Sequence, residues 1–140
     1  MIKNYYYLTA GVLAILFSIS HAWNGQITVL PLLNITAITT ETKAIFFYVW
    51  HIITAENMLL GFVFLYMSVQ KDASKITFMA WVFAILMILR LIVIIGGTLF
   101  FNASELKNII LDIVAIVIYV TIIVLGIGEN YKNKVSRNSY

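Results

Sequence analysis

Four long apolar runs are the feature that most limits how this chain can fold. They cover residues 5–23, 44–69, 76–101 and 108–128. About 20 apolar residues are enough for a helix to cross the hydrocarbon core of a bilayer. Hydrophobic residues make up 62% of the chain and charged residues 11%, against roughly 25% charged in a typical soluble domain. The excess apolar surface is therefore expected to face lipid.

The breaks between the runs are short, except for residues 24–43, so consecutive helices have to run antiparallel. The sequence predicts an all-α protein, an integral membrane four-helix bundle with up-down topology. Residues 1–128 form one four-span transmembrane domain in this prediction. Residues 129–140 are polar and are expected to be a disordered cytoplasmic tail.

The first connection, residues 24–43, is apolar but not long enough to span. Pro31 and a run of β-branched residues argue against a continuing regular helix there. Two interpretations stay open. The segment is either a flap lying in the outer membrane interface or an extended linker without a role of its own.

Basic residues near the ends of the spans predict the orientation, because cytoplasmic loops carry an excess of Lys and Arg. Six basic residues fall on one side and two on the other, which places both termini in the cytoplasm. We expect a multi-pass protein of a cell membrane, typically a bacterial inner membrane. The six are Lys3, Lys71, Lys75, Lys132, Lys134 and Arg137, and the two are Lys43 and Lys107.

The composition also excludes several classes of function. The chain has no cysteine, which excludes disulfides, Cys-ligated zinc or iron–sulfur sites and thiol chemistry. A formal net charge of +3 is too small and too dispersed for nucleic-acid binding. The expected partners are the lipid bilayer, further copies of the chain or a larger membrane complex, and a lipid or quinone ligand.

Five ionisable side chains lie within or close to the ends of the spans, where they tend to mark function: His21, His51, Glu56, Arg90 and Asp112. At about 1.5 Å per residue, His51 lies roughly 12 Å, Glu56 roughly 20 Å and Asp112 roughly 6 Å from the outer end of its span. By the same measure, Arg90 lies roughly 16 Å in, and His21 is close to the outer interface. All five therefore belong to the outer half or the midplane.

Helical spacing groups these residues on faces. Small residues let membrane helices approach closely, so a small-residue stripe in the first span is expected to face the other helices and to carry His21 with it. A polar and small face in the second span includes His51, whereas Glu56 points away from it. The stripe is Gly11, Ala14, Ser18, His21 and Gly25, and the second face is Trp50, His51, Thr54, Asn57 and Gly61.

Two interpretations of these groups remain. In the first, an ion pair of Arg90 with a carboxylate fixes helix register and the histidines bond to backbone. In the second, Glu56, Arg90 and Asp112 leave one excess negative charge, which calls for a raised carboxylate pKa, a protonated histidine or a bound cation. The second interpretation predicts a polar site centred on His21, His51 and Arg90, for a small ligand, a lipid headgroup or a quinone.

The same residues are also compatible with other functions. Two histidines on neighbouring helices suit bis-imidazole ligation of haem b, with Arg90 or Lys43 on the propionates. A metal site would need His21, His51 and a carboxylate, but the sequence has no H-x-x-x-H or E-x-x-H spacing, and no metal is predicted. A proton relay would need a path through the inner half, where few polar residues occur. An accessory subunit without a ligand, or a homo-oligomer, remains the contrasting hypothesis.

A short motif then suggests a group of proteins. His21 to Gly25, Pro31 and the pair Trp50-His51 form the pattern H-x-x-x-G, then P, then W-H, over about residues 18–62. This pattern resembles that of uncharacterised small four-span bacterial inner-membrane proteins. The resemblance implies a four-span fold and a pair of histidines worth testing. Those proteins often carry an acidic residue directly after the glycine, where this chain has Gln26.

Overall fold

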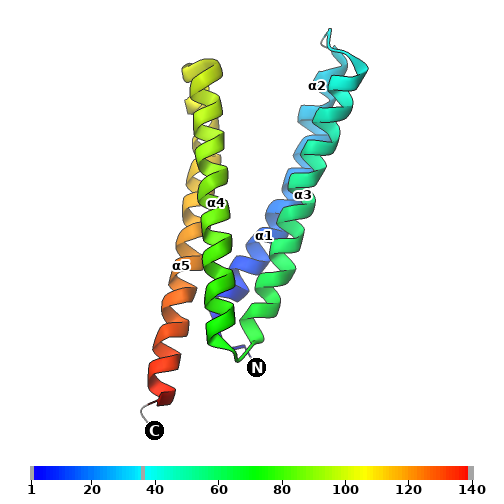
Figure 1. Ribbon diagram of the computed structural model, residues 1–140. Coiled ribbons are helices and arrows are strands. Elements are labelled where there is room, and N and C mark those ends of the chain that lie inside the picture. Colours follow the sequence, from blue (N-terminus) through cyan, green and yellow to red (C-terminus); the bar gives the residue numbers. More distant parts are fainter. Residues whose placement is uncertain (1, 36, 139–140) are drawn as a thin grey trace. The chain divides into compact units, whose positions relative to one another are not determined.

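The computed structural model describes residues 2–35 and 37–138, and the regular secondary structure in these ranges is entirely helical (Figure 1). The elements follow one another as short and long helices. They are α1 (Tyr5–Asn24), the π-helical turn η1 (Gly25–Val29), α2 (Leu30–Ile35), α3 (Thr40–Val69), α4 (Ala73–Asn102), the 3₁₀ segment η2 (Ala103–Ile109) and α5 (Ile110–Asn138). The all-α prediction is confirmed.

Three helical stretches among the described residues are long and apolar enough to cross a membrane, rather than the four spans expected. They are Tyr5–Asn34, Thr40–Val69 and Ser74–Lys132, with 30, 30 and 59 residues. The third joins the expected third and fourth runs, because helical conformation continues from α4 through η2 into α5. Within this stretch the chain reverses direction at η2, so that α4 and α5 lie side by side (Figure 1).

The first connection is helical over residues 25–35. The expectation that a regular helix does not continue through Pro31 is therefore wrong, and so is the extended linker. The helix changes to a π turn at Gly25, in which the Leu30 N–H donates to the Gly25 carbonyl. Pro31 follows this π turn as the second residue of α2.

The polar end of the chain also continues as helix. α5 extends to Asn138, so a disordered tail over residues 129–138 is a wrong prediction. Glycines at 126 and 128 do not end the helix, and Asn130 is buried. Residues 139 and 140 lie outside the described ranges.

The chain divides into two compact units. Unit 1 consists of residues 1–10 and 67–140, and unit 2 of residues 11–66. The division falls inside α1 and inside α3, so both helices contribute to each unit.

In unit 2, α1 and α3 pack antiparallel at very short range. A Cβ atom at Gly11 would lie 2.8 Å from the Leu65 nitrogen and 2.9 Å from the Gly61 carbonyl oxygen. A Cβ atom at Gly61 would meet Ile15 and the Gly11 carbonyl oxygen, at 2.5 and 3.1 Å. Only glycine at both positions allows backbones to approach this closely.

In unit 1, capping side chains mark where the helices begin. The Asp72 carboxylate accepts from the Lys75 N–H at 3.3 Å and caps the start of α4. The Asn102 side chain accepts from the Ser104 N–H at 3.2 Å, where the backbone leaves α4 for η2. These local bonds fix the limits of the α4–α5 hairpin.

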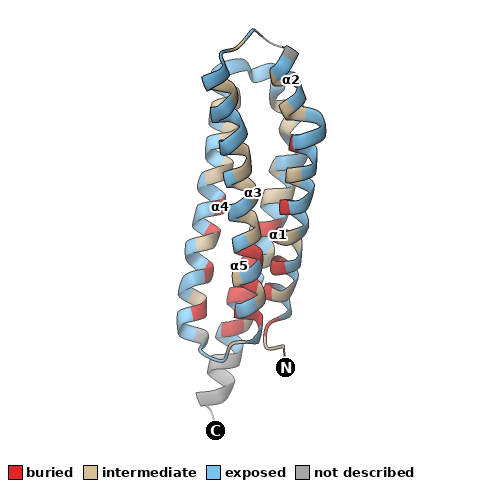
Figure 2. Cartoon of the chain, turned by 90° about the vertical axis from the view of Figure 1, so that its right-hand side faces the viewer, coloured by how far each residue is buried: buried red, intermediate tan, exposed pale blue. Residues whose placement is uncertain are grey.

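A buried polar cluster holds the start of the chain against α5. The Asn4 amide donates to the Gly126 carbonyl at 2.8 Å and to Asn130 at 3.0 Å, and the Asn130 amide donates to the Tyr7 hydroxyl at 3.2 Å. The N–H groups of Lys3 and Asn4 donate to the Ser68 carbonyl. In unit 1 the buried residues gather toward the end that carries the N-terminus (Figure 2).

Two glycines of α5 allow a matched test of this packing. A Cβ atom at Gly126 would lie 2.4 Å from the Tyr7 ring, whereas nothing lies within 4 Å of a Cβ at Gly128. Gly126→Ala should lower the free energy of unfolding by about 1–3 kcal/mol, because overpacking outweighs the gain in helix propensity. Gly128→Ala should leave the free energy of unfolding unchanged or raise it. Thermal unfolding of both variants in detergent measures the difference, and equal stabilities would contradict the contact.

Candidate functional site

The side chains of His21 and Trp50 stack on each other between α1 and α3. Their ring centroids are 4.2 Å apart and the ring planes differ by 6°. The Trp50 indole N–H also donates to the His21 carbonyl at 2.9 Å. Each ring is half-buried, and the His21 Nε2 atom is shielded from solvent. The stack and the hydrogen bond together fix both rings against the backbone of α1.

Gly25 leaves the space that the indole occupies. A Cβ atom on Gly25 would lie 2.0 Å from Trp50 Nε1 and 2.5 Å from Trp50 Cδ1. Gly25 is also the first residue of the π turn η1. Single π turns occur frequently at functional sites. The π turn η1 thus begins at Gly25, the residue against which the Trp50 indole packs.

The residue after this glycine meets the second histidine. Gln26 Nε2 lies 3.0 Å from His51 Nε2. An amide nitrogen donates, so the imidazole Nε2 is the acceptor in this contact. The Phe47 ring packs edge-on against His51, with centroids 4.5 Å apart. Gln26 is exposed and His51 is half-buried. The pair therefore lies at the edge of the contact that α1 and η1 make with α3.

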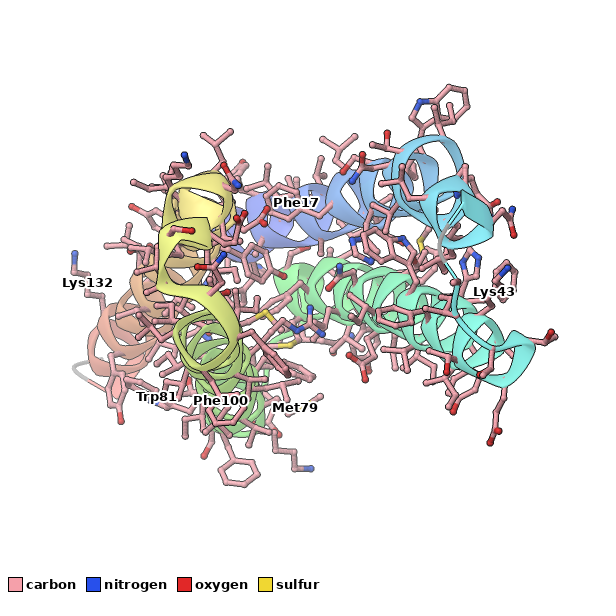
Figure 3. All side chains as sticks on the ribbon, turned by 90° about the horizontal axis from the view of Figure 1, so that it is seen from above. Phe17, Lys43, Met79, Trp81, Phe100 and Lys132 are labelled. Carbon is pink, nitrogen blue, oxygen red and sulfur yellow. The ribbon has the colours of Figure 1, made fainter. Side chains whose placement is uncertain are left out.

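A hydrogen bond between the helices continues the contact toward the glycine crossing. The buried Ser18 hydroxyl donates to the Thr54 carbonyl at 2.8 Å, and the Thr54 hydroxyl donates to the Trp50 carbonyl at 3.3 Å. Side chains of α1 and α3 fill the space between the two ribbons (Figure 3). The predicted stripe of α1 faces the predicted face of α3 at Gly11, Ser18, His21 and Gly25, so this face prediction is confirmed.

The remaining candidates of α3 lie at different distances from the histidines. Thr54 belongs to the contact just described. Asn57 is half-buried one turn further along, whereas Glu56 is exposed. Glu56 thus lies away from the His51 side of α3, as its helical position predicts.

Arg90 and Asp112 belong to unit 1, so the structure places them only with respect to that unit. Arg90 is half-buried on α4 and lies near enough to the Tyr119 hydroxyl of α5 to interact with it electrostatically. Asp112 is exposed in the first turn of α5. The exposure of Glu56 and Asp112 removes the premise that both carboxylates are buried in protein and leave an excess buried charge.

Sequence reasoning missed Gln26 and Phe47 as members of the site. Gln26 lies about 100° around the helix from the centre of the small-residue stripe, at 100° per residue. In the sequence, Gln26 stands out only because the resembled membrane proteins often carry an acidic residue at this position. Phe47 precedes His51 by four residues, which is a spacing of neighbours on a helix. That spacing was the available signal for Phe47.

The cluster does not form a set of metal ligands. Within the described ranges, no three His, Asp or Glu side chains gather as a metal ion requires. The alternative of a metal held by both histidines and a carboxylate therefore finds no third ligand there. Ligation of haem through His51 Nε2 would require Gln26 to move away, because Gln26 engages that atom.

His21 lies further from the end of its helical stretch than the sequence predicts. The helical stretch Tyr5–Asn34 continues for 13 residues beyond His21, about 20 Å at 1.5 Å per residue. His51 lies 11 residues into α3, about 16 Å from its start. Both histidines are thus well inside their helical stretches, and His21 does not lie near the end of one.

Comparisons with protein-family models, with curated proteins and with solved structures gave no match.

The fit of Trp50 over Gly25 can be tested with a matched pair of glycine variants. Gly25→Ala should destabilise the protein by about 1–3 kcal/mol, because the new methyl group overlaps the indole. Gly96→Ala in α4 serves as the control, since nothing lies within 4 Å of a Cβ there. Unfolding in detergent gives the stabilities. Acrylamide quenching reports the exposure of Trp50 when both variants also carry Trp23→Phe and Trp81→Phe, because those two tryptophans are exposed. Unchanged quenching in Gly25→Ala would refute the predicted displacement.

Proposed function

We propose that this chain is a four-span membrane protein with both termini in the cytoplasm. The third apolar stretch then counts as two spans, α4 and α5, of 30 and 29 residues. Each exceeds the roughly 20 residues that a span needs, and η2 forms the turn between them. The charge distribution supports the same orientation. Lys3, Lys71, Lys75 and Lys132 belong to the end of unit 1 at which Asn4 meets Ser68 and Asn130.

The absence of cysteine from the sequence makes the topology directly testable. We expect single cysteines at Ser104→Cys and Thr39→Cys to react with a membrane-impermeant maleimide in intact cells. A cysteine at Gln70→Cys should react only after the membrane is opened. Reaction of Gln70→Cys alone in intact cells would reverse the orientation. Reaction of Thr39→Cys but not Ser104→Cys would contradict the fourth span.

We propose further that the His21–Trp50–His51–Gln26 cluster binds a small ligand or a lipid headgroup in the extracytoplasmic half of the membrane. The observation that carries this proposal is the Gln26–His51 pair, which is accessible from outside the helix contact. Lys43 marks a polar end of α3, and His51 lies eight residues beyond it, about 12 Å along the helix. Polar side chains at such depth usually serve a function, because leaving them in hydrocarbon is unfavourable.

The cluster has the features expected of a binding site rather than of helix packing alone. Packing between α1 and α3 is already provided by Gly11, Gly61 and the Ser18–Thr54 hydrogen bond. The stacked His21 and Trp50 rings hold the neighbouring segment rigid, since the indole is also hydrogen-bonded to backbone. A site of this kind favours binding because its polar groups are oriented before the ligand arrives.

Ligand retention by purified protein tests the binding proposal. We expect protein purified in mild detergent to carry a small molecule or lipid that is lost in His51→Ala. Gln70→Ala, outside unit 2, is the matched control and should retain it. Solvent extraction and mass spectrometry of equal amounts of each protein provide the measurement. Identical extracts from the parent and from His51→Ala would refute the proposal.

Haem b is the alternative ligand, because the structure brings two half-buried imidazoles to one region of unit 2. An absorbance spectrum of the same samples, oxidised and dithionite-reduced, distinguishes it. A Soret band that disappears in His51→Ala would identify a haem protein. A colourless parent protein with a bound molecule supports the small-ligand proposal.

A further inference from the structure

Basic side chains gather at the end of unit 1 that carries the buried polar cluster. The Lys3 N–H donates to the Ser68 carbonyl at 2.7 Å, and Lys71 follows Ser68 by three residues, about 10 Å of chain at full extension. Asn130 belongs to the same cluster, and Lys132 lies two residues beyond it, about 3 Å along α5. Buried hydrogen bonds therefore hold three distant segments of the chain, each with a lysine, at one place.

The charge at this end is not balanced within the part of the chain that the structure describes. Lys75 pairs with Asp72 at 3.7 Å, whereas Lys71 and Lys132 are exposed and form no ion pair with a described residue. The Lys132 side chain points away from the helices (Figure 3). The described residues at this end contribute four lysines and two carboxylates, so a net positive charge remains. They are Lys3, Lys71, Lys75, Lys132, Asp72 and Glu129.

The opposite end of unit 1, around η2, does not share this excess. Its described charges are two carboxylates and one lysine, which are Glu105, Asp112 and Lys107. The two ends of the same helical hairpin thus differ in the sign of their net charge. A negatively charged partner is attracted to the basic end alone.

Exposed tyrosines lie next to these lysines in the chain. Tyr5 and Tyr6 follow Lys3 and are 69% and 40% exposed, and Tyr131, beside Lys132, is 60% exposed. Tyrosine rings of membrane proteins concentrate at the level of the lipid headgroups, because the ring is apolar and the hydroxyl is polar. In the orientation proposed above, the nearest anions to the lysines are therefore lipid headgroups.

We infer that this basic end binds anionic phospholipid headgroups of the cytoplasmic leaflet, with Lys71 and Lys132 as the groups that attract them. The inference rests on the proposed orientation, which brings the basic end to that leaflet. Attraction between a lysine and a charged membrane surface extends over about one Debye length, roughly 10 Å at 0.1 M salt. Zwitterionic headgroups have no net charge and are attracted much less. The basic end therefore prefers phosphatidylglycerol to phosphatidylcholine.

Competition between two lipids tests this inference on the full-length protein. Protein in mild detergent is given equal amounts of phosphatidylglycerol and phosphatidylcholine with the same acyl chains, and native mass spectrometry measures the lipids retained. We expect about tenfold preference for phosphatidylglycerol, as attraction by two exposed lysines predicts. The pair Lys71→Gln and Lys132→Gln should bring retention of the two lipids close to equal.

A matched pair of substitutions controls for the loss of charge itself. Lys43→Gln with Lys107→Gln removes the same two charges, one in unit 2 and one at the η2 end of unit 1, and should keep the preference. Circular dichroism shows whether each protein keeps its helices. Equal retention of both lipids by the parent, or an unchanged preference after Lys71→Gln and Lys132→Gln, would overturn the inference.

Nanodiscs extend the test to a bilayer. Replacing part of the phosphatidylcholine by phosphatidylglycerol should raise the thermal midpoint of the parent more than that of the Lys71→Gln and Lys132→Gln protein. The difference should largely disappear at 1 M salt, where the Debye length is about 3 Å. A difference that persists at this salt concentration would contradict an electrostatic site. Nanodiscs present lipid to both ends of the protein, so reversed maleimide labelling would refute the orientation and the assigned leaflet, and leave the lipid preference standing.

Discussion

The close approach of the α1 and α3 backbones at Gly11 and Gly61 is the contact on which the candidate site depends. No side chain separates the helices there, since a Cβ on either glycine would fall within 3.2 Å of backbone atoms of the other helix. Lipid offers no hydrophobic driving force for helix association, so packing and interhelical hydrogen bonds have to supply it in a membrane. From this crossing the helices extend to Ser18 and Thr54 and then to His21 and Trp50. A larger residue at the crossing would separate them along this whole length.

The contact between α1 and α3 could be predicted from the sequence because small residues repeat at helical spacing. Gly11, Ser18 and Gly25 occur on the face that the structure packs against α3, and the predicted position of Glu56 away from His51 also agrees. The apolar runs likewise predicted the helices. They did not predict that η2 would continue the helical conformation between α4 and α5, because the sequence shows a polar break at residues 102–107.

The π turn and the Gln26–His51 pair could not be predicted by the same argument. Helical-face analysis assumes a constant 100° per residue, and a π turn changes the phase of all residues after it. Pro31 and the β-branched residues argue that the helix ends, yet helical conformation continues through η1 and Pro31 in α2. Gln26 lies outside the predicted stripe, and its neighbour in space, His51, is 25 residues away in sequence. Depth and charge balance group Arg90 and Asp112 with the histidines, but neither specifies a contact.

His21 and His51 have different surroundings in the α1–α3 contact, one at its centre and one at its edge. This difference supports the proposed ligand more strongly than the presence of two histidines does. A histidine that only fixes helix register belongs at the centre, where His21 is stacked on Trp50 and its neighbours are bonded to backbone. His51 and Gln26 instead meet at the edge, with exposed Phe47 beside them. Hydrogen-bonding groups at the edge of a helix pair contact whatever surrounds the protein, and in the membrane topology proposed above that surrounding is lipid or a molecule dissolved in it.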